Sequence, residues 1–257
     1  MKRHGQLMAQ IADAENLRLA FWKASKGKRG KADCRAFQAQ WEEHLAALRA
    51  ELLAGEVAVG DYHYFTVQDP KKRLICAAAF RERVLHHALM NVCEPVLERA
   101  AVRDSYACRK GKGRLLAVER AQSYTRTHCW FLKLDIRKYF DSIHQPTLRA
   151  LLGQKFKDPL LLGVFDRIIG SYQTAPGRGL PIGNLTSQHF ANYYLAPLDR
   201  FVTETLQRGA YVRYMDDFVV WGDSGRELRA VCERVREFLA RELKLDLNDK
   251  TIINRTT

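Results

Sequence analysis

Two adjacent aspartates, Asp216 and Asp217, stand between two apolar runs in residues 211–222, which read YVRYMDDFVVWG. The runs are rich in β-branched and aromatic residues, so they predict two strands joined by a tight turn that carries both acids. A carboxylate in apolar surroundings costs several kcal/mol unless a cation or a hydrogen-bond donor meets it. A divalent metal ion would meet that need. The alternative is an ordinary hairpin turn, in which aspartate is common.

A third aspartate, Asp135, follows the apolar run CWFLKL of residues 129–134, which predicts a strand that ends on a carboxylate. Acids that are far apart in sequence, each at the tip of a central strand, could share a pair of Mg²⁺ ions, with substrate phosphates completing the oxygen shell. Two such ions activate an attacking hydroxyl and stabilise a leaving pyrophosphate. The acidic positions together therefore predict phosphoryl-transfer chemistry.

Basic residues gather in short segments that could contact phosphates. Residues 62–67 and 73–76 predict the strands of a hairpin, with DPKK of residues 69–72 as its turn. Glycine-containing basic loops occupy residues 23–31 and 109–114. Contact with a polyphosphate or a nucleic-acid backbone is one interpretation. Solvated loops and a charged, aggregation-resistant hairpin edge are the alternatives.

Composition points to an anionic partner and to a reducing compartment. The chain has 257 residues, 42 Lys and Arg against 29 Asp and Glu, and a formal net charge of +13. A globular protein with this field most often meets nucleic acid. Its six cysteines are scattered without a CxxC pair, which argues against a zinc site or a disulfide framework. We therefore expect reduced thiols and a cytoplasmic protein, since no apolar run is long enough to span a membrane and the N-terminus lacks a secretory signal.

Helical periodicity surrounds the predicted strands and supplies the scaffold that must position the acids. The predicted fold class is α+β, with a small antiparallel sheet backed by helices. A helix over 80–98 is expected to break near Pro95. Gly55 is expected to form the C-cap of the preceding helix, residues 37–54. The expected helices cover residues 7–22, 37–54, 80–98, 115–126, 145–156, 159–172, 188–206 and 227–243.

The sequence resembles the reverse transcriptases. LDIRKYF (134–140) resembles the family's motif A, LPIGNLTSQ (180–188) its motif B, and YMDD (214–217) its catalytic hairpin, in the right order and spacing. Matches to the family's finger motifs begin near residue 17, and the resemblance continues to the end of the chain. It implies a right-hand polymerase in which residues 1–127 form an N-terminal extension and fingers and residues 128–257 form the palm.

The resemblance implies a role for each acidic position. It makes Asp135 and Asp216 the main ligands of two Mg²⁺ ions, with Mn²⁺ as the alternative metal, and the backbone carbonyl of Ile136 assists. Asp217 completes the acidic cluster. Lys250 matches a lysine that protonates the leaving pyrophosphate, and an exposed lysine at a helix end is the alternative interpretation.

The resemblance also implies a nucleotide-binding set, made up of Lys71, Lys72, Arg73, Lys138, Tyr139, Phe140, Ile182 and Gly183. Arg73 matches a finger arginine that holds the incoming triphosphate, and the two lysines before it could share that role. Lys138 and Tyr139 would offer backbone amides to the phosphates. Phe140 falls at the steric-gate position, where a ring excludes a ribose 2′-hydroxyl, and a core aromatic is the alternative.

Motif B departs from the commonest family pattern. Most reverse transcriptases have Gln where this chain has Ile182, and Ser-Pro where it has Ser187-Gln188. The variant resembles the reverse transcriptases of diversity-generating retroelements, which copy a template repeat RNA with errors at adenines and work with a small basic accessory protein. The expected partners are therefore template RNA, a DNA primer, deoxynucleoside triphosphates and such a protein. A group II intron-like or defence-associated reverse transcriptase and an inactive RNA-binding remnant are the alternatives.

The family continues past Lys250 into a primer grip and a helical thumb, whereas this sequence stops at Thr257. The expectation is a thumb that is absent or truncated, with a fragment or a second chain as the two explanations. Weak processivity in isolation would follow.

Overall fold

The computed structural model describes residues 3–68 and 71–256, so Asp69 and Pro70 of the expected DPKK turn lie outside the described residues. The chain forms two compact units. The first unit combines residues 1–99 with 145–189, and the second combines 100–144 with 190–257. Each unit is thus built from two separate stretches of sequence, and the fingers–palm boundary at 127/128 remains a prediction.

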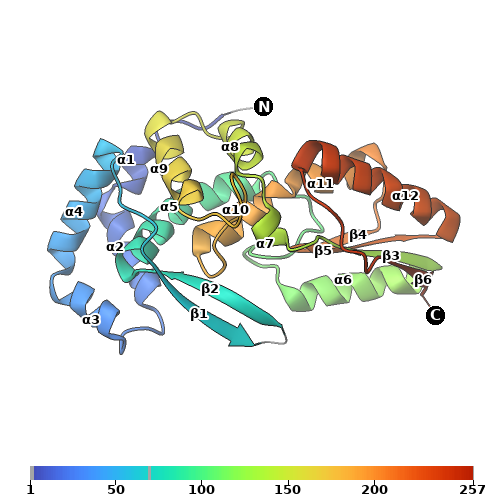
Figure 1. The fold of residues 1–257 in the computed structure, drawn as a ribbon, viewed down its shortest axis with the longest axis horizontal. Coiled ribbons are helices and arrows are strands. Elements are labelled where there is room, and N and C mark those ends of the chain that lie inside the picture. The colour runs from blue at the N-terminus through green and yellow to red at the C-terminus, as the bar shows by residue number, and fades with distance from the viewer. Residues whose placement is uncertain (1–2, 69–70, 257) are drawn as a thin grey trace. The chain divides into compact units, whose positions relative to one another are not determined.

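The first unit is mainly helical and carries one hairpin (Figure 1). Its elements are α1 (Met8–Ile11), α2 (Ala14–Ser25), α3 (Ala32–Ala39), α4 (Trp41–Ala54), β1 (Tyr62–Gln68), β2 (Lys72–Ala78), α5 (Phe80–Glu98), α8 (Gln145–Gly153), α9 (Pro159–Gly170) and the first turn of α10 (Leu185–Tyr194). Asp13 caps α2 by accepting hydrogen bonds from the backbone N–H groups of Glu15 and Asn16 at 3.0 and 3.2 Å. Gly55 ends α4 in the left-handed region at φ 73°, as its position in the sequence predicts.

The expected break of α5 at Pro95 is wrong. The helix runs unbroken from Phe80 to Glu98, with Pro95 inside it. Val96 and Leu97, which follow the proline, are buried along with the apolar face that precedes it. Continued burial of that face offsets the hydrogen bond that proline cannot donate.

The second unit contains a four-stranded antiparallel sheet in the order β4-β5-β3-β6. Its elements are α6 (Arg114–Thr127), β3 (Trp130–Asp135), α7 (Tyr139–Ser142), the rest of α10, α11 (Ala196–Arg200), the π-helical turn η1 (Phe201–Thr205), β4 (Tyr211–Tyr214), β5 (Asp217–Gly222), α12 (Gly225–Phe238), the π-helical turn η2 (Leu239–Leu243) and β6 (Ile252–Arg255). The expected α+β class, with a small antiparallel sheet backed by helices, is confirmed.

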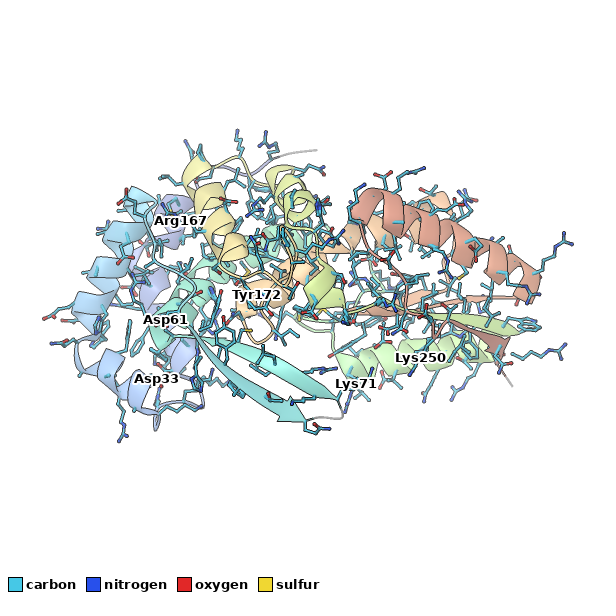
Figure 2. All side chains as sticks on the ribbon, in the orientation of Figure 1. Asp33, Asp61, Lys71, Arg167, Tyr172 and Lys250 are labelled. Atoms are coloured by element: carbon cyan, nitrogen blue, oxygen red, sulfur yellow. The ribbon has the colours of Figure 1, made fainter. Side chains whose placement is uncertain are left out.

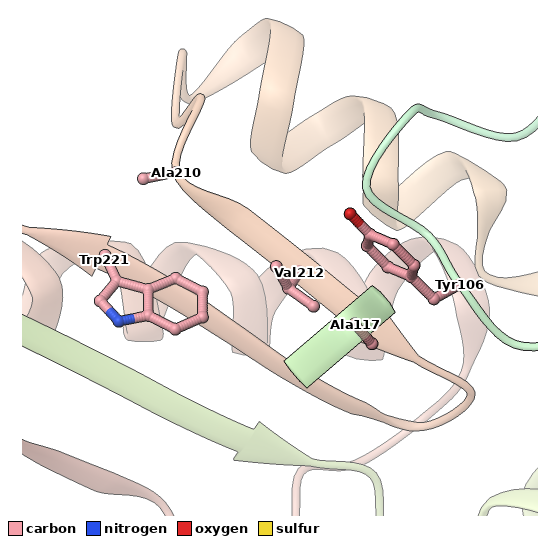
Figure 3. Packing of buried hydrophobic residues seen from close by; sticks show 5 residues of the cluster. All are labelled: Tyr106, Ala117, Ala210, Val212 and Trp221. Carbon is pink, nitrogen blue, oxygen red and sulfur yellow. The ribbon is translucent and has the colours of Figure 1, made fainter. Parts of the chain in front are cut away.

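Helices cover both faces of this sheet. Leu132 and Leu134 of β3 and Phe218 and Val220 of β5 are buried on one face, and α12 contacts these strands. On the other face α6 packs over β4 and β5 (Figure 1). The cluster beneath α6 is drawn in Figure 3 and consists of Tyr106, Ala117, Ala210, Val212 and Trp221. Burial on both faces holds the strand ends that carry the acids.

No helix in residues 3–68 and 71–256 combines the length and the apolar character that crossing a membrane would require.

Candidate active site

The β4–β5 hairpin places Asp216 and Asp217 at the edge of the sheet. Tyr214 pairs with Asp217, so Met215 and Asp216 form a two-residue turn. Met215 has a φ of 58°, in the left-handed region that costs a non-glycine residue about 1–3 kcal/mol. The turn therefore needs outside support, and such strain is typical of functional sites.

Arg213 supplies that support from beneath the turn. Its Nη1 donates a hydrogen bond to the Met215 carbonyl at 3.0 Å and another to Asn192 Oδ1 at 2.8 Å. Its Nε and Nη2 donate to the two oxygens of Asp199, both at 2.6 Å. Tyr211 also donates to Asp199, at 2.7 Å. This buried network fixes the turn that carries Asp216.

The charge of Arg213 is secured by its partner. Its side chain is 1% exposed and that of Asp199 is fully buried. Burial lowers the pKa of Arg213, but the charge and hydrogen bonds of Asp199, together with Tyr211 and Tyr139, raise it above the ordinary arginine range. No sequence pattern had predicted this pair. A charged residue inside the apolar run YVRY was the available signal, because a buried charge needs a partner.

Asp135 ends β3 directly opposite the hairpin. Asp135 and Asp217 are paired residues on neighbouring strands, so their side chains project from the same face of the sheet. Asp135 and Asp216 are half-buried, and Asp217 is exposed. Like charges directly opposite each other destabilise a sheet. A bound cation would relieve that repulsion.

The segment before β6 holds Asp135 from its other side. Asn248 donates from its backbone N–H to the Asp135 carbonyl at 2.7 Å and from Nδ2 to Asp135 Oδ2 at 2.9 Å. Ile136, the next residue of motif A, is buried and forms an antiparallel bridge with Leu247. Asn248 fixes the orientation of the Asp135 carboxylate. No motif in the sequence predicts this role for Asn248, and its place two residues before Lys250 was the available signal.

The rest of motif A turns away from β3 at once. Lys138 has a φ of 44° and precedes the short helix α7. The Tyr139 hydroxyl is buried and donates to the Ala191 carbonyl, and burial raises its pKa well above the usual tyrosine value. Phe140 is half-buried with its ring edge-on to Tyr139, the centroids 5.7 Å apart.

Motif B docks on β2 within the first unit. The Ile182 carbonyl accepts a hydrogen bond from Cys76 N–H at 2.8 Å, and Ile182 itself is half-buried. Gly183 has a φ of 115°, and a Cβ there would lie 2.8 Å from Ile75 Cγ2. Only glycine fits that backbone beside β2 without displacing a neighbour.

The predicted phosphate-binding cations are exposed. Arg73 pairs with Val67 near the tip of the β1–β2 hairpin, and Lys72 pairs with Gln68. Lys71 precedes them at the tip, where Figure 2 labels it.

Lys250 lies in the loop that joins Asn248 to β6, in the second unit (Figure 2). Its backbone N–H donates to Asn248 Oδ1 at 3.3 Å. It is therefore an exposed loop lysine and not a helix-end residue, because the preceding helical turn already ends at Leu243.

The structure thus brings part of the predicted set together in each unit. The second unit holds Asp135, Ile136, Lys138, Tyr139, Phe140, Asp216, Asp217 and Lys250, and the first holds Lys71, Lys72, Arg73, Ile182 and Gly183.

Across the described ranges, no group of three or more His, Cys, Asp or Glu residues is arranged as a metal site by the protein alone. The donor set at the sheet edge consists of carboxylate oxygens, the hard ligands that Mg²⁺ prefers, and Mg²⁺ commonly takes only one or two carboxylates plus substrate phosphates. The residues present therefore fit such ions in a substrate complex.

The fold of the chain is similar to that of solved telomerase structures. The chain superposes on telomerase from Candida albicans in complex with a fragment of telomeric RNA with a TM-score of 0.58 and 13% identity, covering 84% of this chain and 47% of that one. It also superposes on apo telomerase from Candida tropicalis, truncated from its C-terminal domain, with a TM-score of 0.58 and 12% identity over 76% of this chain and 50% of that one. The chain spans about half the length of these telomerases.

Residues 68–252, more than half of the chain, match the family described as reverse transcriptase (RNA-dependent DNA polymerase). The chain belongs to this family. It is 26% identical to protein YkfC of Escherichia coli over 84% of this chain and 69% of the relative. It is 25% identical to a protein in the cob intron of Schizosaccharomyces pombe over 70% of this chain and 22% of that protein. It is also 25% identical to nuclear intron maturase 1 of Arabidopsis thaliana over 34% of this chain and 12% of that protein.

Proposed function

We propose that the chain extends a DNA primer on an RNA template by two-metal phosphoryl transfer from deoxynucleoside triphosphates. The observation that carries this proposal is the pairing of Asp135 with Asp217 across neighbouring strands, beside the Asp216 turn, in a member of the reverse transcriptase family. The buried Arg213–Asp199 pair and Asn248 hold these acids in place.

Asp135 and Asp216 would hold the metal ions, with the Ile136 carbonyl assisting and Asp217 completing the negative site. When bound, two Mg²⁺ or Mn²⁺ ions would supply Lewis acidity for the primer hydroxyl and neutralise charge on the leaving pyrophosphate. Lys250 would donate a proton to that pyrophosphate. Its position in the loop that also carries Asn248 supports this role.

The incoming nucleotide would be held by the remaining set. Arg73, with Lys71 and Lys72, would bind the triphosphate, and the backbone amides of Lys138 and Tyr139 would contact it. Phe140 would exclude a ribose 2′-hydroxyl by its ring. In this assignment residues 1–127 form an N-terminal extension and fingers and residues 128–257 the palm, and the protein works in the cytoplasm.

Metal removal tests the polymerase proposal. The purified chain, given a primed RNA template and deoxynucleoside triphosphates, should extend the primer with Mg²⁺, stop in excess EDTA and resume when Mg²⁺ or Mn²⁺ is restored. Gel analysis of a labelled primer measures this. RNA binding with no extension in any metal would instead identify an RNA-binding remnant.

A second prediction concerns Asn248. Replacing it by alanine removes the donor to Asp135 Oδ2, and loss of such an outer contact typically weakens metal affinity by about 10–100-fold. Mn²⁺ binding to the protein–primer–template complex, measured by electron paramagnetic resonance, should weaken accordingly. Asn254→Ala is the matched control, since Asn254 lies exposed on β6. Equal Mn²⁺ affinities in the two variants would contradict the proposal that Asn248 positions Asp135.

We further propose the diversity-generating retroelement type, with a template repeat RNA and a small basic accessory protein as partners. Ile182 supports it, because an alkyl group in place of an amide removes a hydrogen-bonding constraint beside the nascent pair. Ile182→Gln should lower adenine misincorporation several-fold in sequenced cDNA. An unchanged adenine error rate would contradict the link.

An intron-associated role is the second candidate, and the likeness to proteins of fungal and plant introns favours it. Copurification with an intron RNA, and errors spread evenly over template bases, would select it over the retroelement type.

A further inference from the structure

Gln145 is a fully buried polar residue at the start of α8, in the first unit. Its backbone N–H donates a hydrogen bond to the Gly177 carbonyl at 2.9 Å. Its side-chain Nε2 donates to three further carbonyls, those of Ile169 at 2.8 Å, Tyr172 at 2.7 Å and Gly179 at 3.0 Å. One residue therefore contacts the end of α9 and both ends of the loop that leads into motif B.

The orientation of this amide is fixed by its surroundings. Three carbonyl oxygens identify the atom between them as the nitrogen, because an amide oxygen there would repel all three. The other amide atom, Oε1, is buried and has no hydrogen-bond partner in the part of the chain that the structure describes. An unsatisfied buried acceptor costs free energy, and the donated bonds must outweigh that cost. The side chain is thus suited to holding backbone carbonyls in place.

The loop that Gln145 contacts is a compact turn. Thr174 N–H donates to the Arg178 carbonyl at 3.0 Å, and Arg178 N–H donates to the Ala175 carbonyl at 2.9 Å. Gly179 follows with a φ of 105°, and a Cβ there would lie 2.8 Å from Thr174 Oγ1. These bonds close the turn on itself, so fixing its two ends fixes the whole turn.

Motif B follows the turn directly. Leu180 and Pro181 are buried, and the proline ring fixes its own backbone φ between the turn and Ile182. The Ile182 carbonyl then accepts a hydrogen bond from Cys76 N–H of β2 at 2.8 Å. Motif B is therefore held by Gln145 at one end and by β2 at the other. A shift of the turn would displace Ile182, because only two restricted residues separate them.

We propose that Gln145 is a positioning residue for nucleotide binding, which fixes the turn before motif B and thereby the place of Ile182 and Gly183. This inference rests on the proposed function, which assigns those two residues to the incoming nucleotide. Gln145 is itself fully buried, so it acts through them. Asp135 and Asp216 belong to the second unit. Loss of the Gln145 contacts should therefore weaken nucleotide binding more than it slows bond formation.

Gln145→Met tests this proposal, because methionine keeps the length of the side chain and removes its donors. Gln154→Met is the matched control, since it makes the same substitution at an exposed position directly after α8. Gly179→Ala is the second variant, in which the added Cβ would crowd Thr174 in the same turn. It leaves the buried amide unchanged, so it decides the case if Gln145→Met does not fold.

Two measurements are combined. Hydrogen–deuterium exchange followed by mass spectrometry, without metal or substrate, reports the local stability of the turn. Single-turnover addition of one deoxynucleotide to a primed RNA template, over a series of nucleotide concentrations, gives the nucleotide affinity and the maximal rate separately.

Both test variants should accelerate exchange in residues 172–183 about tenfold, while α5 exchanges as in wild type. Both should weaken nucleotide affinity about tenfold, the factor expected for one lost hydrogen bond, with a maximal rate within about threefold of wild type. Gln154→Met should match wild type in both measurements.

Exchange of residues 172–183 at the wild-type rate in Gln145→Met would overturn the proposal. Equal acceleration in α5 would overturn it too, because that result indicates a general loss of stability. So would a loss confined to the maximal rate. A wild type that adds no nucleotide would contradict the proposed function instead, and exchange would still decide whether Gln145 fixes motif B.

Discussion

Replacing Asp199 by alanine is expected to lower the free energy of unfolding by about 3–5 kcal/mol, because it strands a buried guanidinium. Arg213 is 1% exposed and donates to both Asp199 oxygens at 2.6 Å. Without the carboxylate its charge has no counterion, and the bond from Tyr211 is lost as well. Urea unfolding followed by circular dichroism measures the change.

A surface pair provides the comparison. Asp249 lies 3.6 Å from Arg137, with the two side chains 85% and 60% exposed. Asp249→Ala should change the free energy of unfolding by less than about 1 kcal/mol, since exposed pairs contribute little. The double change Asp199→Leu/Arg213→Met should recover part of the loss, because removing both charges avoids an uncompensated one. Equal stability of Asp199→Ala and Asp249→Ala would contradict the role assigned to the buried pair.

The same pair matters for function, because Arg213 also donates to the Met215 carbonyl in the turn. The left-handed backbone at Met215 is maintained by this bond and by the strand pairing on either side. Activity of the Asp199 variant should therefore be lost together with stability.

Strands β3, β4 and β5 and their acidic tips could be predicted from sequence, because each is an apolar run that ends at a turn or an acid. Strand β6, which is mostly exposed, was not predicted. The apolar runs beside Asp135 and Asp217 predict strands, and these two residues are paired in register. The C-cap role of Gly55 could also be predicted from sequence, since helix C-termini favour glycine.

What the sequence did not disclose are the contacts between distant segments. Asn248 reaches Asp135 from 113 residues away, and Asp199 meets Arg213 through a buried network. Pro95 predicted a break in the helix, but α5 continues through it because its buried face extends past the proline. In each case tertiary packing determines the local structure, and the sequence pattern of a single segment does not reveal that packing.

In the proposed function, the acids at the sheet edge catalyse extension of a primer on RNA. The most direct measurement is single-turnover addition of one complementary deoxynucleotide to a primed RNA template with Mg²⁺, comparing wild type, Asp216→Asn and Asp249→Asn. Asp216→Asn should be slower by about a thousandfold, because several kcal/mol of charge stabilisation are lost and each 1.36 kcal/mol is tenfold.

Asp249→Asn, an equal change of charge at an exposed site, should stay within about twofold of wild type, as expected for a surface substitution. Primer–template affinity should be the same in all three proteins. An Asp216→Asn protein that adds the nucleotide at the wild-type rate, or a wild type that binds the primed template and adds nothing, would contradict the account.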